Sequence, residues 1–234
     1  MRKILAALAL LTGLAACTDI APRGGGDILV LGDSIMAWNG QNAIPEVIAR
    51  ETGRSVINRA VPGAQFDNGS TIASAVGFDI QAQFPGGRWN WVLVNGGAND
   101  LSADCGCGAC AASVNALISA DGQSGSIPAF LQDLRARTGA QVMWMGYYAG
   151  SNRGSFAGCR DDLVEIERRI ARFAARTPGV HFVDSEDVID RRDRGLFGGD
   201  NVHPSARGSA RIGAYLAQEI TAREKRSQTP ASSL

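Results

Sequence analysis

The apolar residues of the chain gather in five short runs, which are separated by longer segments of mixed polarity. Most of the runs are rich in β-branched or aromatic residues, and this composition favours buried strands. The runs occupy residues 28–31, 55–60, 91–95, 141–147 and 180–184.

The segments between the runs carry helical periodicity. Within 160–176, apolar residues recur every three or four positions with Arg and Glu between them, which predicts an amphipathic helix. Acidic residues at 161 and 162 suit the positive end of that helix. A last helix is expected after Pro204, with the proline in its first turn. Weaker patterns predict helices over 43–52 and 126–138.

Strands and helices therefore alternate along the chain. This order predicts an α/β fold with a parallel sheet that is covered by helices on both faces. In such folds, functional groups lie outside the carboxyl ends of the strands. The segments that follow the five runs are thus the candidate site, and they are 32–34, 61–64, 96–100, 147–153 and 199–204.

Composition agrees with a folded, single-domain protein. The chain has 234 residues, of which 45% are hydrophobic and 20% charged, with a formal net charge of zero. This balance excludes a disordered chain and a membrane-spanning one. Without a basic surplus, nothing indicates a nucleic-acid partner.

The first seventeen residues, MRKILAALALLTGLAAC, have a basic start, an apolar run and then small residues, which is the layout of an export signal. The end of this segment, Leu14 to Cys17, resembles the lipobox of bacterial lipoproteins. That resemblance implies lipidation of Cys17, and Thr18 after it implies the outer membrane, facing the periplasm. An ordinary secretory signal cut nearby is the alternative. Because Arg2 and Lys3 leave with the signal, the mature chain has a net charge near −2.

We expect four segments in the chain. Residues 1–17 form the signal peptide and 18–27, with three consecutive glycines, form a flexible tether. Residues 28–220 form the folded domain, and the polar residues 221–234 form a C-terminal tail.

Four further cysteines are present at positions 105, 107, 110 and 159. Export places them in an oxidising compartment, so disulfides are the first interpretation. Four cysteines allow three pairings, and the spacing does not select one. A metal site built from the same cysteines is the alternative.

Four short blocks make the chain resemble the SGNH hydrolases, also called the GDSL esterase/lipase family. Gly32-Asp33-Ser34 matches the nucleophile block, although Ile35 stands where the family name has leucine. Three further blocks follow in the family's order. Gly63 matches a single-glycine block, and Gly97, Asn99 and Asp100 match a Gly-x-Asn-Asp block. Asp200 and His203 match an Asp-x-x-His block.

The resemblance implies a three-layer α/β/α sandwich with a five-stranded parallel sheet, the flavodoxin-like fold. It also implies catalysis by Ser34, His203 and Asp200, and an oxyanion hole made of the Ser34 and Gly63 N–H groups and the Asn99 amide. In the family's strand order, the third and fourth strands are neighbours. We therefore expect one disulfide from the 105–110 loop to Cys159 and one closed within the loop.

Chemistry supports these roles independently. A serine hydroxyl needs a base, and the chain has only two histidines. His181 lies inside a predicted strand, whereas His203 lies in a loop, three residues after an acid that can orient its ring. Capping of the last helix is the alternative role for Asp200 and His203. Asp33 and Asp100 are expected to bind nearby loop backbone.

No motif in the sequence implies a cofactor or a metal. The expected function is a serine ester hydrolase, with lysophospholipase- or thioesterase-like activity as one form of it. O-acetyl esterase or O-acetyltransferase activity on envelope carbohydrate is an alternative, and so is a non-catalytic binding lipoprotein. The expected partners are an ester substrate and, through the anchor only, the membrane. Two sets of residues are candidates for the substrate pocket: Met36, Trp38, Phe66, Leu196 and Phe197 for an apolar acyl group, or Asn152 and Arg153 for a sugar or an anion.

Overall fold

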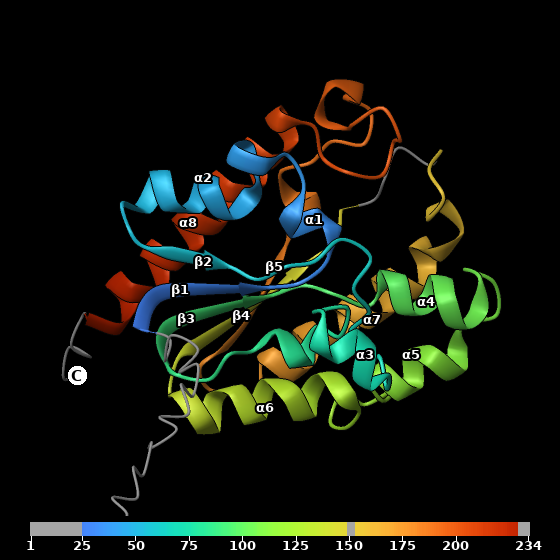
Figure 1. The fold of residues 1–234 in the computed structure, drawn as a ribbon, viewed down its shortest axis with the longest axis horizontal. Helices are drawn as coiled ribbons and strands as arrows, with labels where there is room; N and C mark the ends of the chain where they lie inside the picture. Colours follow the sequence, from blue (N-terminus) through green and yellow to red (C-terminus); the bar gives the residue numbers. More distant parts are fainter. Residues whose placement is uncertain (1–24, 149–152, 229–234) are drawn as a thin grey trace, which may run out of the picture.

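The computed structural model describes residues 25–148 and 153–228 of the chain. The predicted signal peptide, Cys17 and the first seven residues of the tether lie outside this range. Within it, the chain forms one central sheet with helices on both sides (Figure 1).

The sheet has five strands in the order β2-β1-β3-β4-β5, and every neighbouring pair is parallel. This is the fold class expected from the alternating pattern and from the family resemblance, and it is confirmed. The strands are β1 (Gly25–Leu31), β2 (Val56–Asn58), β3 (Arg88–Val94), β4 (Gln141–Gly146) and β5 (Val180–Asp184).

Two helices cover one face of the sheet and four cover the other (Figure 1). The first pair is α2 (Ile44–Thr52) and α8 (Ala206–Gln228); the second group is α4 (Ala98–Cys105), α5 (Ala111–Leu117), α6 (Ser126–Thr138) and α7 (Arg160–Ala174). Short helices on the connecting loops are α1 (Ser34–Ala37), α3 (Thr71–Ala75) and the 3₁₀ turns Gly40–Asn42, Gln81–Gln83, Ala157–Cys159, Ser185–Asp187 and Arg194–Leu196.

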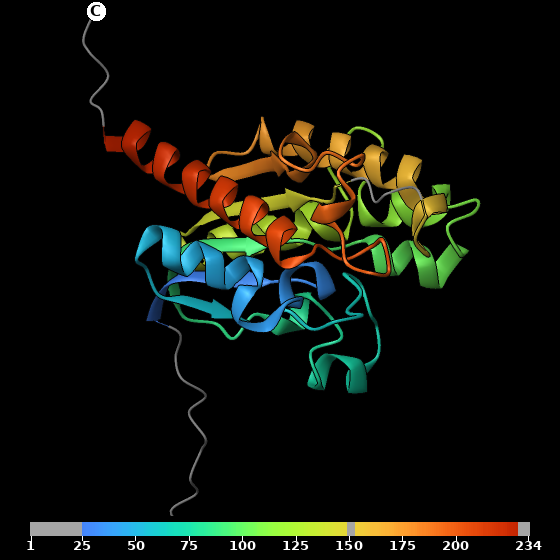
Figure 2. The same ribbon diagram turned by 90° about the horizontal axis from the view of Figure 1, so that it is seen from above.

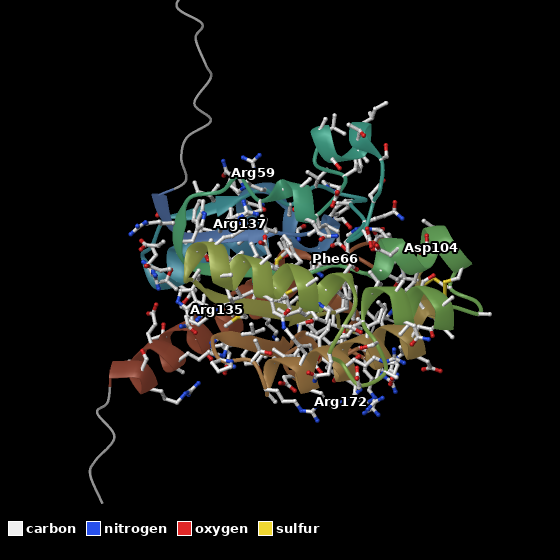
Figure 3. The ribbon with its side chains drawn as sticks, turned by 90° about the horizontal axis from the view of Figure 1, so that it is seen from below. Arg59, Phe66, Asp104, Arg135, Arg137 and Arg172 are labelled. Atoms are coloured by element: carbon white, nitrogen blue, oxygen red, sulfur yellow. A yellow bond between two sulfur atoms is a disulfide. The ribbon has the colours of Figure 1, made fainter. Side chains whose placement is uncertain are left out.

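Successive residues of β1 alternate between two hydrophobic cores. Ile28 and Val30 pack toward α2 and α8, whereas Leu29 and Leu31 pack toward the helices of the other face. Because both faces are covered, the strand appears in the sequence as a continuous apolar run. Figure 3 shows the second face, where α6 lies across the sheet and the Phe66 ring contacts Phe130 of α6 at 5.7 Å between centroids.

The folded region is longer at both ends than the sequence pattern predicted. Residues 25–27 of the expected tether belong to β1, where Gly26 pairs with Trp89 of β3. The first eight residues of the expected tail, 221–228, belong to α8. Glu224 holds that part of the helix to the sheet, since it accepts hydrogen bonds from Trp91 Nε1 (2.8 Å) and Arg54 (2.6 Å).

The expectation that Pro204 lies in the first turn of the last helix is wrong. The helix begins at Ala206, and the Ser205 hydroxyl accepts a hydrogen bond from the Gly208 N–H at 3.2 Å as its cap. Pro204 precedes the cap and pairs with Phe197 in an isolated bridge. None of the helices in residues 25–148 and 153–228 is both long and apolar enough to cross a membrane.

Candidate active site

Strand order creates a crevice at the carboxyl edge of the sheet. The chain runs from β1 to β2 on one side of β1 and then returns to β3 on the other side. Loops therefore diverge between β1 and β3, and ligands of open α/β sheets bind at such a switch point. Ser34 directly follows the turn after β1, and Asn99 is the second residue of α4 after β3. The topology thus brings these two predicted site residues to the same crevice.

Ser34 is the first residue of α1, and Asp33 is its N-cap. The Asp33 carboxylate accepts a hydrogen bond from the Ile35 N–H at 2.9 Å, and the Asp33 carbonyl accepts one from the Ala37 N–H at 3.1 Å. At this first helical position, the Ser34 N–H has no intrahelical acceptor and points away from the helix. The local sequence therefore presents both the hydroxyl and the N–H of Ser34 at the strand end.

Two buried side chains fix the turn that carries Ser34. Gln83 bonds both backbone groups of Gly32, with Oε1 accepting at 2.8 Å and Nε2 donating at 2.9 Å. The Tyr147 hydroxyl donates to Asp33 Oδ2 at 2.5 Å. Burial raises the pKa of Asp33, and the hydrogen bonds from Tyr147 and Ile35 and the proximity of His203 offset part of that rise. Asp33 therefore holds loop backbone, as expected.

Gly63 lies in a tight turn next to the Ser34 loop. The Ala64 N–H donates to the Val61 carbonyl at 3.1 Å, and Gly63 has a φ of 83° in the third position of the turn. With Pro62 before it, this is the type II pattern, which needs glycine at that position. The Val61 N–H donates to the Gly32 carbonyl at 3.1 Å, so the turn is tied to the nucleophile loop.

Asp100 holds the other end of the Gly63 loop. Its two carboxylate oxygens accept hydrogen bonds from the Phe66 N–H (2.7 Å) and the Asp67 N–H (2.9 Å). Burial raises the pKa of Asp100 to about 6, although both backbone hydrogen bonds lower it. Asp100 therefore positions loop backbone, as expected.

Asn99 reaches across to the same loop. Its Nδ2 donates to the Ala64 carbonyl at 2.9 Å, and the nearest acceptor for its second hydrogen is Asp33 Oδ2 at 3.5 Å. The second distance is beyond that of a strong N–H···O bond. One hydrogen of the amide is thus fixed on the protein, and the other is available to a ligand.

His203 and Asp200 are joined in the loop before α8. Asp200 Oδ1 accepts from the N–H groups of Val202 and His203, both at 3.0 Å, and Oδ2 lies 2.5 Å from His203 Nδ1. Burial acts to raise the pKa of Asp200, but the hydrogen bonds from His203 and from the loop outweigh it and lower the pKa. The bond at Nδ1 leaves Nε2 of the ring for another partner.

The segment that follows Ser34 supports His203. The Trp38 ring stacks on the imidazole with 3.9 Å between centroids and 11° between planes. The Asn39 amide donates to the Pro204 carbonyl (2.9 Å) and to the Ser209 hydroxyl (2.8 Å). Within the described residues, no hydrogen bond joins Ser34 Oγ to His203, a contact that often tightens only when substrate binds.

A cavity of about 70 Å³ opens beside Ser34. Asn99, Tyr147 and Tyr148 line it from the carboxyl edge of the sheet, and Asn201 and Val202, the residues before His203, also contribute. Further lining residues come from one side of α7, the turn before it and the Ser185–Asp187 turn after β5, with Gly154, Phe156, Ala157, Arg160, Leu163, Val164, Glu167 and Glu186.

The residues expected to form the substrate pocket lie mainly elsewhere. Met36, Phe66, Leu196 and Phe197 are at most 6% exposed and belong to the two hydrophobic cores, because apolar residues near a motif also support the loops beneath it. Trp38 stacks on His203 instead of lining the cavity. Arg153 is exposed and does not line the cavity, and Asn152 lies outside the described residues.

The pattern placed Tyr147 and Tyr148 in a candidate segment, 147–153, but did not single them out, and it gave no reason to select Glu167. A signal for Glu167 existed, since it lies one residue after Ile166 and three before Ile170, on the apolar side of the predicted helix. A carboxyl group in that position is either buried and paired or part of a site.

His181 is a strand residue, as predicted. It pairs with Met143 across β4 and β5, and its Nε2 lies 2.8 Å from Gln141 Oε1. Burial lowers the pKa of His181 to about 4, together with the nearby arginines.

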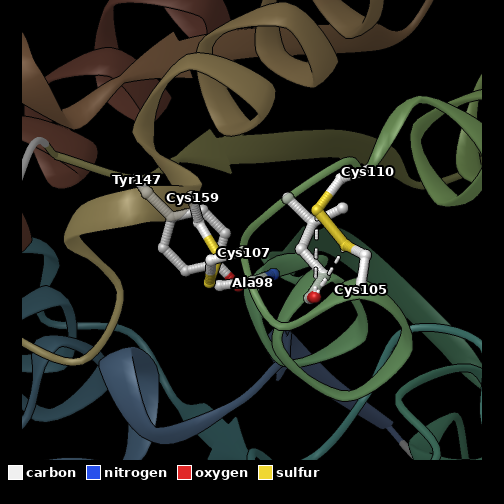
Figure 4. Close-up of a disulfide and its surroundings, with 7 residues drawn as sticks. Ala98, Cys105, Cys107, Cys110, Tyr147 and Cys159 are labelled. Carbon is white, nitrogen blue, oxygen red and sulfur yellow. Dashed lines mark hydrogen bonds between the residues drawn. A yellow bond between two sulfur atoms is a disulfide. The ribbon is translucent and has the colours of Figure 1, made fainter.

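Two disulfides join the four cysteines at the end of α4, in the loop after it and before α7 (Figure 4). Cys105 bonds Cys110 within the loop, and Cys107 bonds Cys159, which directly precedes α7. This is the arrangement that the family strand order led us to expect. It leaves none of these four thiols for the alternative metal site. Since α7 forms one wall of the cavity, the second disulfide anchors that wall to the loop after α4.

The flavodoxin-like sheet and the polar groups gathered at its switch point define the class, an α/β protein whose site is built from strand-end loops. The model of the GDSL-like lipase/acylhydrolase family matches residues 30–211. The chain therefore belongs to that family, as its four sequence blocks indicated, and it is a hydrolase of ester bonds. A non-catalytic binding lipoprotein is accordingly set aside.

Solved structures share this fold at low identity. A candidate platelet activating factor from Streptococcus pneumonia is 16% identical, with a TM-score of 0.62 and 86% of each chain covered. Est24, a carbohydrate acetylesterase from Sinorhizobium meliloti, is 18% identical, with a TM-score of 0.56 over 85% of this chain and 100% of that one. A family two carbohydrate esterase from Clostridium thermocellum, in complex with cellohexaose, is 17% identical, with a TM-score of 0.57 over 85% and 64%. No curated protein matches the chain.

Proposed function

We propose that the protein is a serine esterase that cleaves short-acyl esters through Ser34, His203 and Asp200. One observation carries the proposal: Asp200 Oδ2 lies 2.5 Å from His203 Nδ1, in a loop tied to the segment that follows Ser34. A carboxylate at Nδ1 fixes the tautomer in which Nε2 is a base, and this is the role of the acid in serine hydrolases.

In the proposed reaction, Ser34 Oγ attacks the acyl carbon while His203 Nε2 takes the hydroxyl proton. The ester C–O bond then breaks, and His203 returns the proton to the departing alkoxide, which leaves as the alcohol. Water attacks the acyl-enzyme in the same way, His203 again accepts and returns a proton, and the carboxylic acid and free Ser34 are formed.

The proposed oxyanion hole has three donors. The Ser34 N–H lies at the start of α1, the Gly63 N–H lies in a turn whose own hydrogen bond does not use it, and Asn99 Nδ2 has one hydrogen beyond strong-bond distance of any acceptor. Donors already fixed before the reaction stabilise the developing charge without a cost of reorganisation.

The size of the cavity favours a short acyl group. A volume of about 70 Å³ beside Ser34 leaves room for a small acyl group. O-acetylated carbohydrate is a second candidate substrate, because an acetyl group fits this volume and because two structurally similar proteins are carbohydrate esterases. Transfer of the acyl group to a sugar in place of water would make the protein an O-acetyltransferase.

A chain-length series tests the proposed substrate class. p-Nitrophenyl esters from acetate to palmitate should give the highest kcat/KM at two to four carbons, and Ser34→Ala should abolish turnover of all of them. Ser102→Ala, on the exposed side of α4, is the matched control and should retain activity. A maximum at palmitate would contradict the short-acyl proposal and would favour a lysophospholipase- or thioesterase-like activity. A panel of acetylated sugars with and without an acceptor sugar separates hydrolysis from transfer.

We also propose that Cys17 is lipidated and that the protein is anchored to the periplasmic side of the outer membrane. Seven residues separate Cys17 from Gly25 at the start of β1, so the anchor lies at most about 28 Å away. β1 begins at the sheet edge opposite the candidate site (Figure 2). This placement supports a site that faces away from the membrane and toward envelope material.

A further inference from the structure

One wall of the cavity has chemistry that ester cleavage does not require. Arg160, Leu163, Val164 and Glu167 recur at helical spacing on one side of α7 and line the cavity beside Ser34. None of them belongs to the proposed triad or oxyanion hole. Leu163 and Val164 are apolar, and Glu167 places a carboxyl group beside them. Glu186 also lines the cavity and forms an ion pair with Arg160 at 3.5 Å.

The fold makes room for that carboxyl group. Glu167 is 6% exposed, and its Oε1 accepts a hydrogen bond from the Tyr147 N–H at 2.5 Å. Gly146 ends β4 beside it, where a Cβ atom would lie 3.2 Å from the carboxyl carbon and from Oε1. No described residue donates to Oε2, although Oε2 is not sealed off from solvent. Since Glu167 lines the cavity, we place Oε2 at the cavity surface.

Glu167 is surrounded by groups that favour its neutral form. Burial raises the pKa of this carboxyl well above its usual range, and the carboxylates of Asp184 and Glu186 raise it further. The Tyr147 hydrogen bond and Arg160 lower the pKa but do not offset the effect of burial. Because Oε1 accepts from Tyr147, a proton on Oε2 gives the cavity an O–H donor.

In the proposed mechanism, the cavity receives the acyl part of the ester. The alcohol must leave next to the proton donor, His203, which does not line the cavity, whereas the oxyanion donor Asn99 does line it. With the carbonyl oxygen at Asn99, a short acyl chain lies in the part of the cavity that Glu167 also lines.

We propose that Glu167 is a specificity-determining residue that hydrogen-bonds a hydroxyl group on a short acyl chain bound beside Ser34. The inference rests on the proposed function of Ser34 as nucleophile. It narrows the substrate class to esters of short hydroxy acids.

A matched substrate pair tests this in the wild-type protein. We expect kcat/KM for p-nitrophenyl 3-hydroxybutyrate to exceed that for p-nitrophenyl butyrate by about tenfold or more, because a site with a buried polar group disfavours a substrate that leaves it unpaired. Equal or higher kcat/KM for plain butyrate would overturn the inference. In that case, turnover of the butyrate ester together with a fluorophosphonate adduct at Ser34 would still support the proposed esterase function. No turnover and no adduct would overturn both the esterase function and the role of Glu167.

Variants at position 167 assign the preference to this side chain. Glu167→Gln keeps an acceptor for the Tyr147 N–H and a donor toward the cavity, so it should retain the preference for the hydroxy ester. In Glu167→Leu, the ratio of kcat/KM for the hydroxy ester to kcat/KM for the butyrate ester should fall about tenfold. Glu165→Leu, on the same helix but paired with Arg168 and Arg169, is the matched control and should keep it. If Glu167→Leu does not fold, two results still contradict the proposed role of Glu167. One is that Glu167→Gln loses the preference for the hydroxy ester, and the other is that the wild type shows no such preference.

Discussion

At the scale of single residues, the site depends on polar side chains that hold backbone in place. Gln83, Asp33 and Asp100 are at most 2% exposed, and each accepts hydrogen bonds from the loops that carry the site. A buried polar group left unpaired costs about 1–3 kcal/mol, so these contacts give the loops defined positions.

Removal of the Asn99 amide tests the oxyanion hole. Asn99→Ala should lower kcat about 10²–10³-fold with little change in KM, since the lost donor acts mainly on the transition state. Steady-state kinetics on p-nitrophenyl acetate measure this effect. Asn90→Ala, on β3 and bonded to Asp27, is the control and should leave kcat unchanged. A loss confined to KM would mean that Asn99 only binds the ground state.

Asp100 should make stability depend on pH. Its folded-state pKa of about 6 is above the unfolded value of 3.8, so the folded state retains a proton that the unfolded state loses. The stabilising contribution is complete below about pH 3.8 and is lost as pH rises through 6, on the order of 3 kcal/mol in all. Urea unfolding between pH 4 and 7 should therefore show a smaller pH dependence for Asp100→Asn than for the wild type.

Glu51→Gln is the control for that experiment, because Glu51 lies on α2, on the other face of the sheet, with an exposed side chain. It should keep the pH dependence of the wild type. If Asp100→Asn also kept it in full, the raised pKa of Asp100 would be wrong.

The site residues that a motif identifies could be predicted, and those that only packing identifies could not. Ser34, Gly63, Asn99, Asp200 and His203 lie in blocks with recognisable chemistry. The structure places each at the carboxyl edge of the sheet, in a loop or in the first turn of a helix. Tyr147, Gln83 and Glu167 have no such block, and their roles depend on contacts with residues 20 to 114 positions away.

At the scale of elements, α7 forms a part of the site that contains none of the four family motifs, and the Cys107–Cys159 disulfide anchors it. Cys107–Cys159 links residues 52 positions apart, whereas Cys105–Cys110 links residues 5 apart. Chain entropy gives about 4 kcal/mol for the first bond and about 2 kcal/mol for the second.

Separate removal of the two disulfides tests this difference. Cys107→Ser with Cys159→Ser should lower the free energy of unfolding more than Cys105→Ser with Cys110→Ser, as measured by urea denaturation. The first pair should also lower kcat/KM for short esters, because α7 lines the cavity. Equal destabilisation and equal activity of the two variants would contradict a role for Cys107–Cys159 in holding the cavity wall.

The long, regular elements followed from the sequence pattern, and the short ones did not. The five strands, α2, α6 and α7 have apolar runs or helical periodicity that could be recognised, although β2 is a largely exposed edge strand and not a buried one. α1, α3, α4 and α5 contain four to eight residues each and little periodicity, so tertiary contacts decide their conformation.

At the scale of the whole molecule, the sheet separates the proposed anchor from the site. The start of β1 and the end of α8 lie at one end of the molecule, and the strand-end loops lie at the other (Figure 2). This polarity follows from the parallel arrangement, which sends every strand in the same direction.

The proposed anchor is tested by Cys17→Ser in a bacterial host. The wild type should incorporate radiolabelled palmitate and fractionate with the outer membrane, whereas the variant should lack the label. Soluble activity should be the same for both, because residue 17 lies at the far end of the tether from the site. Unlabelled wild-type protein in the soluble periplasmic fraction would favour an ordinary secretory signal.

The central claim is that Ser34 is the nucleophile and is activated by His203. The most direct measurement is mass-spectrometric mapping of the adduct formed with a fluorophosphonate probe on the folded wild type and on His203→Ala and His181→Ala. We predict one adduct, on the peptide that contains Ser34, formed at the wild-type rate in His181→Ala and at least about 10³-fold more slowly in His203→Ala. An adduct on another residue, or no adduct on correctly folded protein, would contradict the account.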